Sequence, residues 1–377
     1  MIKDIQKINV FYRSEFVGTI GMDPGTHICI FEYDKGWLSN GFSLSPTELP
    51  LKNGLFVADQ NLFRGGFATF EDSLPDGYGL YLLDRLLKKN GSSLEELSPL
   101  QRLAIIGDSG MGALSYKPAM NGFLPQKEIE SLEQLDVLQT EVIQLFSEKG
   151  TGDASLLYYN SANSGGARPK AAFRTKDGRH WLVKFRHFYD AIDCGKTELL
   201  YMITARKCGI NIPQIGLIKD KYFCIERFDL DPDGTKHHVL TAAALLKTNF
   251  RNQDVDYTNL LALTGYLTQD SVQVEEMFRR MVMNLIADNK DDHAKNFSFI
   301  CEDGKWTLAP AYDITYSPSG SNGQHATSLF YDGNPDLYLV LKAGVDIRIP
   351  RERCVEIIEQ VQTVCKESLP TEKITYL

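Results

Sequence analysis

The chain has 377 residues, of which 43% are hydrophobic and 11% aromatic, so it can bury a large core in two or three domains or in one elaborated domain. Its 40 Lys and Arg against 49 Asp and Glu give a formal net charge of −9, which disfavours direct binding to nucleic acid phosphates. The seven cysteines include no CxxC pair, which argues against a zinc site and a disulfide framework. No apolar run approaches the roughly 18 residues of a membrane-spanning helix. We therefore expect a soluble, cytoplasmic protein with reduced thiols and no membrane contact.

The first 120 residues have the pattern of a β-rich domain. Two apolar runs flank the polar residues 13–15 in INVFYRSEFVGTI, which predicts a β-hairpin. The stretch 77–91 predicts an amphipathic helix, because its leucines recur at helical spacing and Gly91 supplies a stop. Prolines and glycines concentrate between residues 118 and 125, just before acidic helix-start residues. We therefore expect a first domain over residues 1–120.

Residues 121–240 predict a second domain that mixes helices and strands. Helical patterns cover 126–149 and 196–208. Between them a Gly-rich loop is flanked by strand-like runs, with Asp177-Gly178 as a hairpin turn, which predicts a strand, loop, strand unit. The stretch KDKYFCIERFDLD predicts two further strands separated by a turn.

Residues 241–377 predict a third domain that is mainly helical. The clearest helix is EEMFRRMVMNLIADN, whose apolar residues form one stripe: Met277, Phe278, Met281, Val282, Leu285 and Ile286. Taken together, the three domains predict an α+β fold.

The strongest candidate for chemistry is DDHAKN, residues 291–296, which lies between that helix and a short predicted strand. Phosphoryl transfer needs a carboxylate that accepts the hydroxyl proton, and further oxygen ligands that hold magnesium. A rigid turn can present both, so we expect Asp291 to be the base and Asn296 a metal ligand. His293 either takes part or only orients the loop by hydrogen bonding, and Lys295 contacts either phosphate or solvent.

Asp313 completes this set. The sequence between Asn296 and Asp313 reads as a β-hairpin, FSFI, EDGK and WTLAP, which would bring the two side chains close together. Single Asp and Asn residues in loops mostly cap helices or form turns. The combination across a hairpin favours a site, because it repeats the order of catalytic loop, hairpin and metal-binding Asp in eukaryote-like kinases, with YD in place of DFG.

The Gly-rich loop Ser161–Lys170 is the second candidate. Its glycines would let backbone amides approach phosphates closely, although GxxxxGK[ST] is missing and a glycine turn alone is more often an ordinary connection. Lys184 in WLVKF strengthens the case, because a lysine in an apolar strand is costly to bury without an anionic partner. The alternative is an edge-strand lysine that extends to water.

Residues 222–229, YFCIERFD, are the third candidate. A strand that runs into a turn can offer backbone groups to an adenine ring, as a kinase hinge does. Taken alone, this segment is only an edge strand with charges at its end.

With these motifs in order, the chain resembles the HipA family of bacterial serine/threonine kinases, the toxins of type II toxin–antitoxin pairs. The likeness runs nearly end to end. Its N-terminal part covers Val17-Gly18, LPDGYG at 74–79 and GDSGMGAL at 107–114. Its C-terminal part covers GGARPKA, LVKF, IERFD, DDHAKNFSF and AYDI. DxHAKN followed by YD is the most specific of these matches.

The resemblance implies a two-lobed protein-kinase-like fold that uses ATP and Mg²⁺. It implies Asp291 as catalytic base with His293 and Lys295 beside it, and Asn296 and Asp313 on magnesium. The residues it places on ATP are Gly165, Gly166, Ala167, Arg168, Lys170, Lys184, Glu226, Arg227 and Phe228. A serine of the Gly-rich loop is autophosphorylated in the family, which ejects the loop; Ser161 and Ser164 are both candidates here. Two added negative charges would repel ATP from such a loop.

The resemblance also implies partners. They are a helix-turn-helix antitoxin, contact with DNA only through that antitoxin, and a protein substrate for which an aminoacyl-tRNA synthetase is the family precedent. One segment departs from the family: HxEDFxQ is replaced by HVLTAAA at 238–244. We therefore expect catalysis to persist, but substrate choice or regulation to differ.

Two other functions compete with this interpretation. A small-molecule kinase of the aminoglycoside or homoserine type also uses an Asp, an Asn and a metal Asp, but it usually shows HGDxHxxN and lacks the N-terminal module. A non-catalytic corepressor that only binds the antitoxin is disfavoured by the intact Asp291, Asn296 and Asp313.

Overall fold

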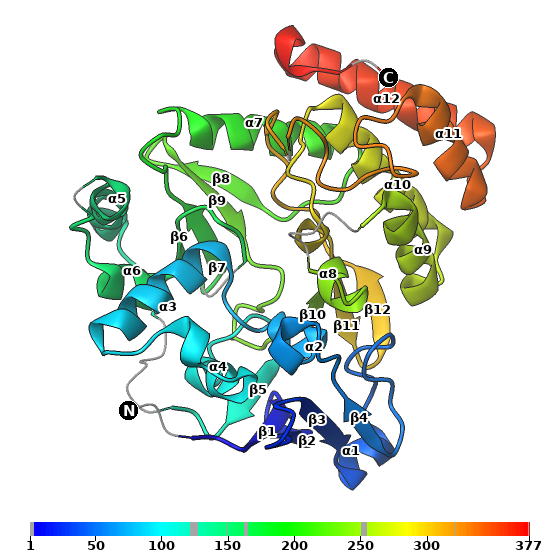
Figure 1. Ribbon diagram of the computed structural model, residues 1–377. Helices are drawn as coiled ribbons and strands as arrows, with labels where there is room; N and C mark the ends of the chain where they lie inside the picture. The colour runs from blue at the N-terminus through cyan, green and yellow to red at the C-terminus, as the bar shows by residue number, and fades with distance from the viewer. Residues whose placement is uncertain are drawn as a thin grey trace. The chain divides into compact units, whose positions relative to one another are not determined.

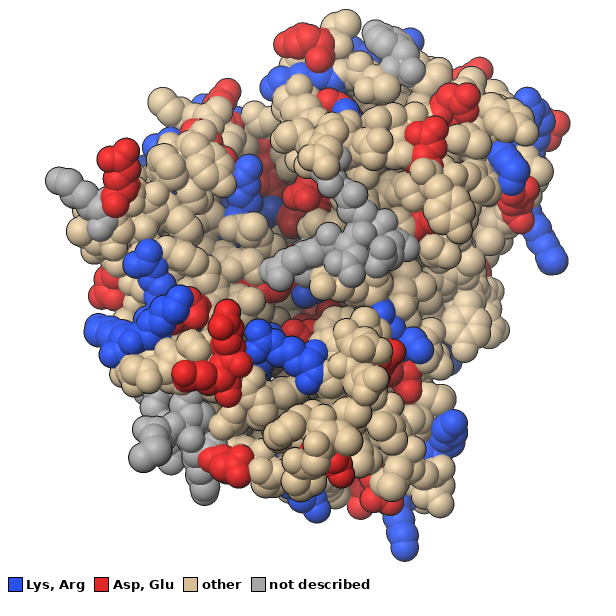
Figure 2. Space-filling view, in the orientation of Figure 1, with Lys and Arg blue, Asp and Glu red and all other residues tan. Residues whose placement is uncertain are grey.

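The computed structural model describes residues 4–120, 127–148, 150–161, 165–249, 255–320, 322–375 and 377. The chain divides into two compact units. The first unit contains residues 1–195, 218–240 and 301–304, and the second contains 196–217, 241–300 and 305–377. Acidic and basic side chains are interspersed over the face in Figure 2.

A five-stranded sheet begins the first unit (Figure 1), with the strand order β4-β3-β2-β1-β5. Its strands are β1 (Lys7–Tyr12), β2 (Glu15–Met22), β3 (Cys29–Tyr33), β4 (Leu55–Val57) and β5 (Leu114–Lys117). β1 and β2 pair antiparallel from Lys7 opposite Gly21 to Tyr12 opposite Glu15, and Arg13 takes a φ of 55° in the turn. The predicted hairpin is therefore confirmed.

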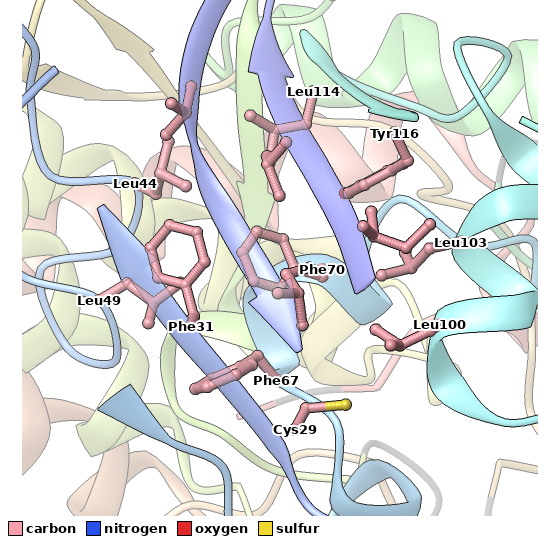
Figure 3. Close-up of a cluster of buried hydrophobic side chains, with 14 of the residues drawn as sticks. Cys29, Phe31, Leu44, Leu49, Phe67, Phe70, Leu100, Leu103, Leu114 and Tyr116 are labelled. Atoms are coloured by element: carbon pink, nitrogen blue, oxygen red, sulfur yellow. The ribbon is translucent and has the colours of Figure 1, made fainter. Parts of the chain in front are cut away.

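A hydrophobic core covers one face of this sheet (Figure 3). Helix α4 (Pro99–Ile106) contributes Leu100 and Leu103, and the short helix α2 (Ala68–Glu71) contributes Phe70. Phe31 of β3 and Phe70 meet edge to face at 5.3 Å between ring centroids. Burying a side chain of this size stabilises the fold by roughly 1.5–3 kcal/mol. Helix α1 (Lys35–Asn40) places Trp37 in the same core.

A second sheet has the order β6-β7-β9-β8. Its strands are β6 (Lys170–Arg174), β7 (His180–Lys184), β8 (Ile215–Ile218) and β9 (Tyr222–Glu226). Helices α3 (Gly77–Lys89), α5 (Leu132–Phe146) and α6 (Ala154–Asn160) share a buried cluster with β6, β7 and β9. Figure 1 shows α3 beside α6. The α3 helix and the β6–β7 hairpin are as predicted.

Two local predictions are wrong. The stretch KDKYFCIERFDLD contains one strand, β9, followed by a turn, and not two strands. The segment before the Gly-rich loop is helix α6, not a strand. Asp153 caps this helix by accepting hydrogen bonds from the amides of Ser155, at 2.9 Å, and Leu156, at 3.2 Å. The cap and the burial of Leu157 and Tyr158 on one helical face outweigh the β propensity of the aromatic residues.

The second unit is mainly helical. Its helices are α7 (Cys194–Lys207), α8 (Ala242–Leu245), α9 (Tyr257–Thr268), α10 (Ser271–Ile286), α11 (Leu337–Asp346) and α12 (Arg351–Ser368). The predicted stripe of α10 is fully buried, and α10 packs against α9 and α12. A third sheet has the order β10-β11-β12. Its strands are β10 (His238–Thr241), of which residues 238–240 belong to the first unit, β11 (Ser298–Glu302) and β12 (Lys305–Leu308). The α+β class is confirmed. Within the described residues, no helix has the length and apolar character needed to span a bilayer.

Candidate active site

The loop 291–296 lies between α10 and β11, as predicted, and closes on itself. It ends in a short 3₁₀ helix, η4 (Ala294–Asn296). The Asn296 amide N–H donates to the carbonyl of His293 at 2.8 Å, and Asn296 Nδ2 donates to the carbonyl of Asp291 at 2.7 Å. Because Nδ2 is used inside the loop, Oδ1 is the Asn296 atom suited to a cation. The Asp291 side chain is 66% exposed, and its Oδ1 lies 3.8 Å from His293 Nε2.

Asp313 is attached to this loop through its neighbour Tyr312. The Tyr312 hydroxyl donates to the carbonyl of Lys295 at 2.7 Å and lies 2.5 Å from the Ser298 hydroxyl on β11. Asp313 itself has a φ of 56°, a left-handed conformation that costs a non-glycine residue roughly 1 kcal/mol or more. Such strain persists only where the surroundings fix the backbone, so neighbouring residues hold the Asp313 backbone in this conformation.

Asn296 and Asp313 line one small pocket. Its other lining residues are Arg280, Asn284, Asn289, Asp292, Phe297, Ala311, Tyr312 and Ile314. The β11–β12 hairpin therefore brings together the two side chains that are predicted to bind magnesium. Asp291 begins the loop that Asn296 ends.

The chemistry of this pocket fits a magnesium ion. The amide oxygen of Asn296 and the carboxylate of Asp313 are hard oxygen donors. Asn289 Oδ1, also from a lining residue, is buried and has no hydrogen-bond partner within the described residues. The described part of the chain contains no group of three or more His, Cys, Asp or Glu side chains that could hold a metal ion. Magnesium is commonly held by one or two protein oxygens together with water and phosphate. Asn296 and Asp313 can provide the two protein oxygens.

Asp292 is a residue of this region that the sequence did not single out. It has no exposed surface. Its carboxylate accepts from the Tyr257 hydroxyl at 2.5 Å and contacts His325 Nδ1 at 2.9 Å. It also accepts from the amides of Ala326, at 2.9 Å, and Thr327, at 3.2 Å. Burial, followed by the charge of Asp292, raises the pKa of Tyr257 well above its usual value, so the tyrosine stays a donor. The loop 291–296 is thus joined to the segment 325–327.

The residues predicted to contact phosphate lie in the first unit. There Lys184 on β7 is paired opposite Lys170 on β6. Lys184 is partly buried, and its Nζ lies 5.7 Å from the centroid of the Phe223 ring. Lys170 is 5% exposed and donates from Nζ to the carbonyl of Gly165. A phosphate contact of Lys184 stays a prediction.

The described part of the Gly-rich loop is already hydrogen-bonded. The Gly166 N–H donates to the carboxylate of Asp76, and the Gly166 carbonyl accepts from the amide of Tyr78 at 3.1 Å. Since the Gly166 amide is in use, the amides of Ala167 and Arg168 are better placed to serve a phosphate. The exposed Arg168 guanidinium pairs with Asp190.

The two serines proposed for autophosphorylation differ. Ser161 is 2% exposed and donates its hydroxyl to the carbonyl of Tyr158 at 2.9 Å. Ser164 lies outside the described residues.

The predicted hinge ends β9, but the Arg227 side chain is used internally. Its Nε and Nη2 contact the two carboxylate oxygens of Asp229 at 2.9 and 2.6 Å, and both side chains are buried. Burial alone would raise the pKa of Asp229, but the Arg227 charge and hydrogen bonds outweigh it and lower that pKa. The Arg227 amide donates to the carbonyl of His180 at 2.8 Å. An adenine contact would therefore fall to the backbone groups of Glu226 or Phe228.

Comparison with known proteins identifies the class. The family model of the HipA N-terminal domain matches residues 8–117 of the sequence, and the family model of the HipA-like C-terminal domain matches residues 162–368. The chain belongs to the HipA family, which confirms the resemblance seen in its motifs.

Individual relatives agree with this assignment. The serine/threonine-protein kinase toxin HipA of Shewanella oneidensis is 23% identical over 335 residues, covering 79% of this chain and 72% of that protein. Y4dM of Sinorhizobium fredii, named as a candidate kinase, is 23% identical over 222 residues, covering 51% of this chain and 54% of that protein. A chain from the solved complex of HipA, HipB and operator DNA of S. oneidensis MR-1 superposes with a TM-score of 0.70 at 19% identity, covering 96% of this chain and 91% of that one. The fold is therefore that of HipA, as predicted.

Proposed function

We propose that this protein is an ATP-dependent serine/threonine protein kinase of the HipA toxin type. The observation that carries the proposal is that Asn296 and Asp313 line the same pocket, at the end of the loop that Asp291 begins. The kinase names of two relatives support it. The complex of a HipA with HipB and DNA supports a helix-turn-helix antitoxin as partner, with DNA reached only through it.

In this proposal each residue has one task. ATP would pass its terminal phosphoryl group to the serine oxygen and leave as ADP, and Mg²⁺, when bound, would neutralise charge on the phosphates. Asn296 Oδ1 and the Asp313 carboxylate hold the cation, and Lys184 neutralises phosphate oxygens. The exposed Asp291 carboxylate takes the proton of the substrate serine hydroxyl. His293, 3.8 Å from that carboxylate, orients it.

Substrate and regulation form the finer part of the proposal. The substrate is a cytoplasmic protein, with an aminoacyl-tRNA synthetase as the first candidate. The segment 238–244 favours a difference from the best-known toxins, because His238 and Ala242 to Ala244 are buried and offer no acidic group. For regulation, Ser164 is the better candidate, since Ser161 would first have to leave its contact with Tyr158.

Labelled ATP with magnesium tests this proposal. Wild type should label itself or a protein substrate, while Asp291→Ala and Asp313→Ala should lower transfer by about 10²–10⁴-fold. Asp346→Ala, which removes an exposed carboxylate paired with Lys342, is the matched control and should keep full activity. Mapping the label identifies the serine. Label in a small metabolite would instead indicate a small-molecule kinase, and the absence of both label and nucleotide binding would indicate a non-catalytic corepressor.

A further inference from the structure

We propose that Asp76, Gly77 and Tyr78 form a clamp that positions the Gly-rich loop for the nucleotide, with Asp76 as its main positioning residue. The inference rests on the proposed kinase function. It assigns a role to the LPDGYG motif, which lies in the N-terminal part of the chain, 90 residues away from Gly166. The N-terminal module would then be a working part of the nucleotide site.

The clamp holds both polar backbone groups of one residue. The Asp76 carboxylate accepts from the Gly166 N–H, and the Tyr78 N–H donates to the Gly166 carbonyl at 3.1 Å. Lys170 holds the preceding carbonyl, that of Gly165. Three consecutive backbone groups of the loop are therefore fixed: the Gly165 carbonyl by a side chain of the loop itself, and both polar groups of Gly166 by residues outside it. Their fixation sets the direction of the amides that follow, at Ala167 and Arg168.

The use of Asp76 is unusual for its position. It is the N-cap residue of α3, where an Asp side chain ordinarily accepts hydrogen bonds from the first-turn amides of its own helix. Its carboxylate makes no such capping bond and turns to the loop instead. Asp76 is 7% exposed, so a buried carboxylate is directed at the loop and the usual capping contact is given up for it.

Gly77 explains how the helix approaches so closely. It has a φ of 42°, and a Cβ there would lie 2.5 Å from the carbonyl oxygen of Gly166 and 2.8 Å from Ala167 Cα. A side chain would therefore push the loop away from the helix. The conformation and the contact distance both require glycine at this position.

Hydrogen–deuterium exchange of the full-length protein without nucleotide tests the clamp itself. In Asp76→Ala, peptides covering residues 165–169 should exchange about tenfold faster, because the fixed amide loses a charged acceptor. Asp76→Asn keeps an acceptor oxygen and should fall between Asp76→Ala and wild type. Asp84→Asn is the control, since that carboxylate lies on the same helix and pairs with the exposed Lys88. Unchanged exchange in Asp76→Ala overturns the clamp, whether or not the protein is a kinase.

ATP kinetics test the positioning role. In Asp76→Ala the KM for ATP should rise about tenfold, with kcat changed less than about threefold, and Asp76→Asn should recover part of the affinity. A variant that exchanges faster in the loop but keeps the wild-type KM overturns the positioning role and leaves the kinase assignment intact. If wild type shows no turnover, equilibrium binding of a fluorescent ATP analogue takes the place of KM. Failure of wild type to bind the analogue overturns both proposals.

Discussion

The loop 291–296, the proposed catalytic loop, and the Gly-rich loop are held in different ways. Asp292 in the catalytic loop has no exposed surface and receives four contacts on one carboxylate. The described part of the Gly-rich loop is held by single contacts to its backbone, while Ala167 and Arg168 stay exposed. In the proposed kinase, the groups for chemistry would therefore be preorganised by folding, whereas the groups for the nucleotide would be held by a few replaceable bonds. Substitutions should accordingly affect stability in one loop and affinity in the other.

The largest expected effect is on Asp292. Asp292→Ala should lower the free energy of unfolding by about 3–5 kcal/mol, because four donors lose a buried charged acceptor. The neighbouring Asp291→Ala should change it by less than about 0.5 kcal/mol, since that side chain is 66% exposed. Urea unfolding at neutral pH measures both variants. Equal losses for the two would contradict the idea of a preorganised catalytic loop.

Acid should act on the first unit through His238. This side chain is buried, and its Nε2 donates to the carbonyl of Leu44 at 2.7 Å. Burial lowers the pKa of His238 from 6.5 to about 4, so the unfolded chain binds this proton more tightly than the folded one. The contribution of neutral, buried His238 to the free energy of unfolding is complete above pH 6.5. It declines by about 3 kcal/mol as the pH falls to 4.

His238→Gln isolates this contribution from that of the carboxylates. Urea unfolding of wild type and variant at pH 7 and pH 4 gives the pH-dependent difference between them. The variant should lose about 3 kcal/mol less on acidification than wild type does. Identical acid losses would show that the acid sensitivity of the protein comes from groups other than His238.

The smallest expected effect is on Tyr312. Tyr312→Phe removes the hydroxyl that joins Lys295 to Ser298, at 2.7 and 2.5 Å, and should cost about 1 kcal/mol of stability. It should also lower kcat while changing the KM for ATP less, since the loop that carries Asp291 loses its hydrogen bond to the Tyr312 hydroxyl. Tyr331→Phe is the control, because that side chain is 97% exposed. A thermal melt combined with initial rates separates the two effects.

Most of the secondary structure near the site could be predicted from local signals. The stripe of α10 and the β11–β12 hairpin are visible as local sequence patterns. The DDHAKN loop is closed by hydrogen bonds from Asn296 to His293 and Asp291, within five residues. Asp292 could not be recognised, because its partners lie 33 to 35 residues away in either direction. The Asp76 contact spans 90 residues. The Arg227–Asp229 ion pair could have been predicted from the sequence, since alternate residues of an extended segment face the same side.

The discontinuity of the first unit has a consequence for protein synthesis. Residues 218–240 join this unit only after the chain has passed through 196–217, and β9 is the neighbour of β7 in the finished sheet. Until β9 leaves the ribosome, β7 presents an unpaired edge of N–H and C=O groups, a template for aggregation. A nascent chain arrested before residue 222 therefore carries the β6–β7 hairpin without its neighbouring strand, and its second sheet stays incomplete with one edge open.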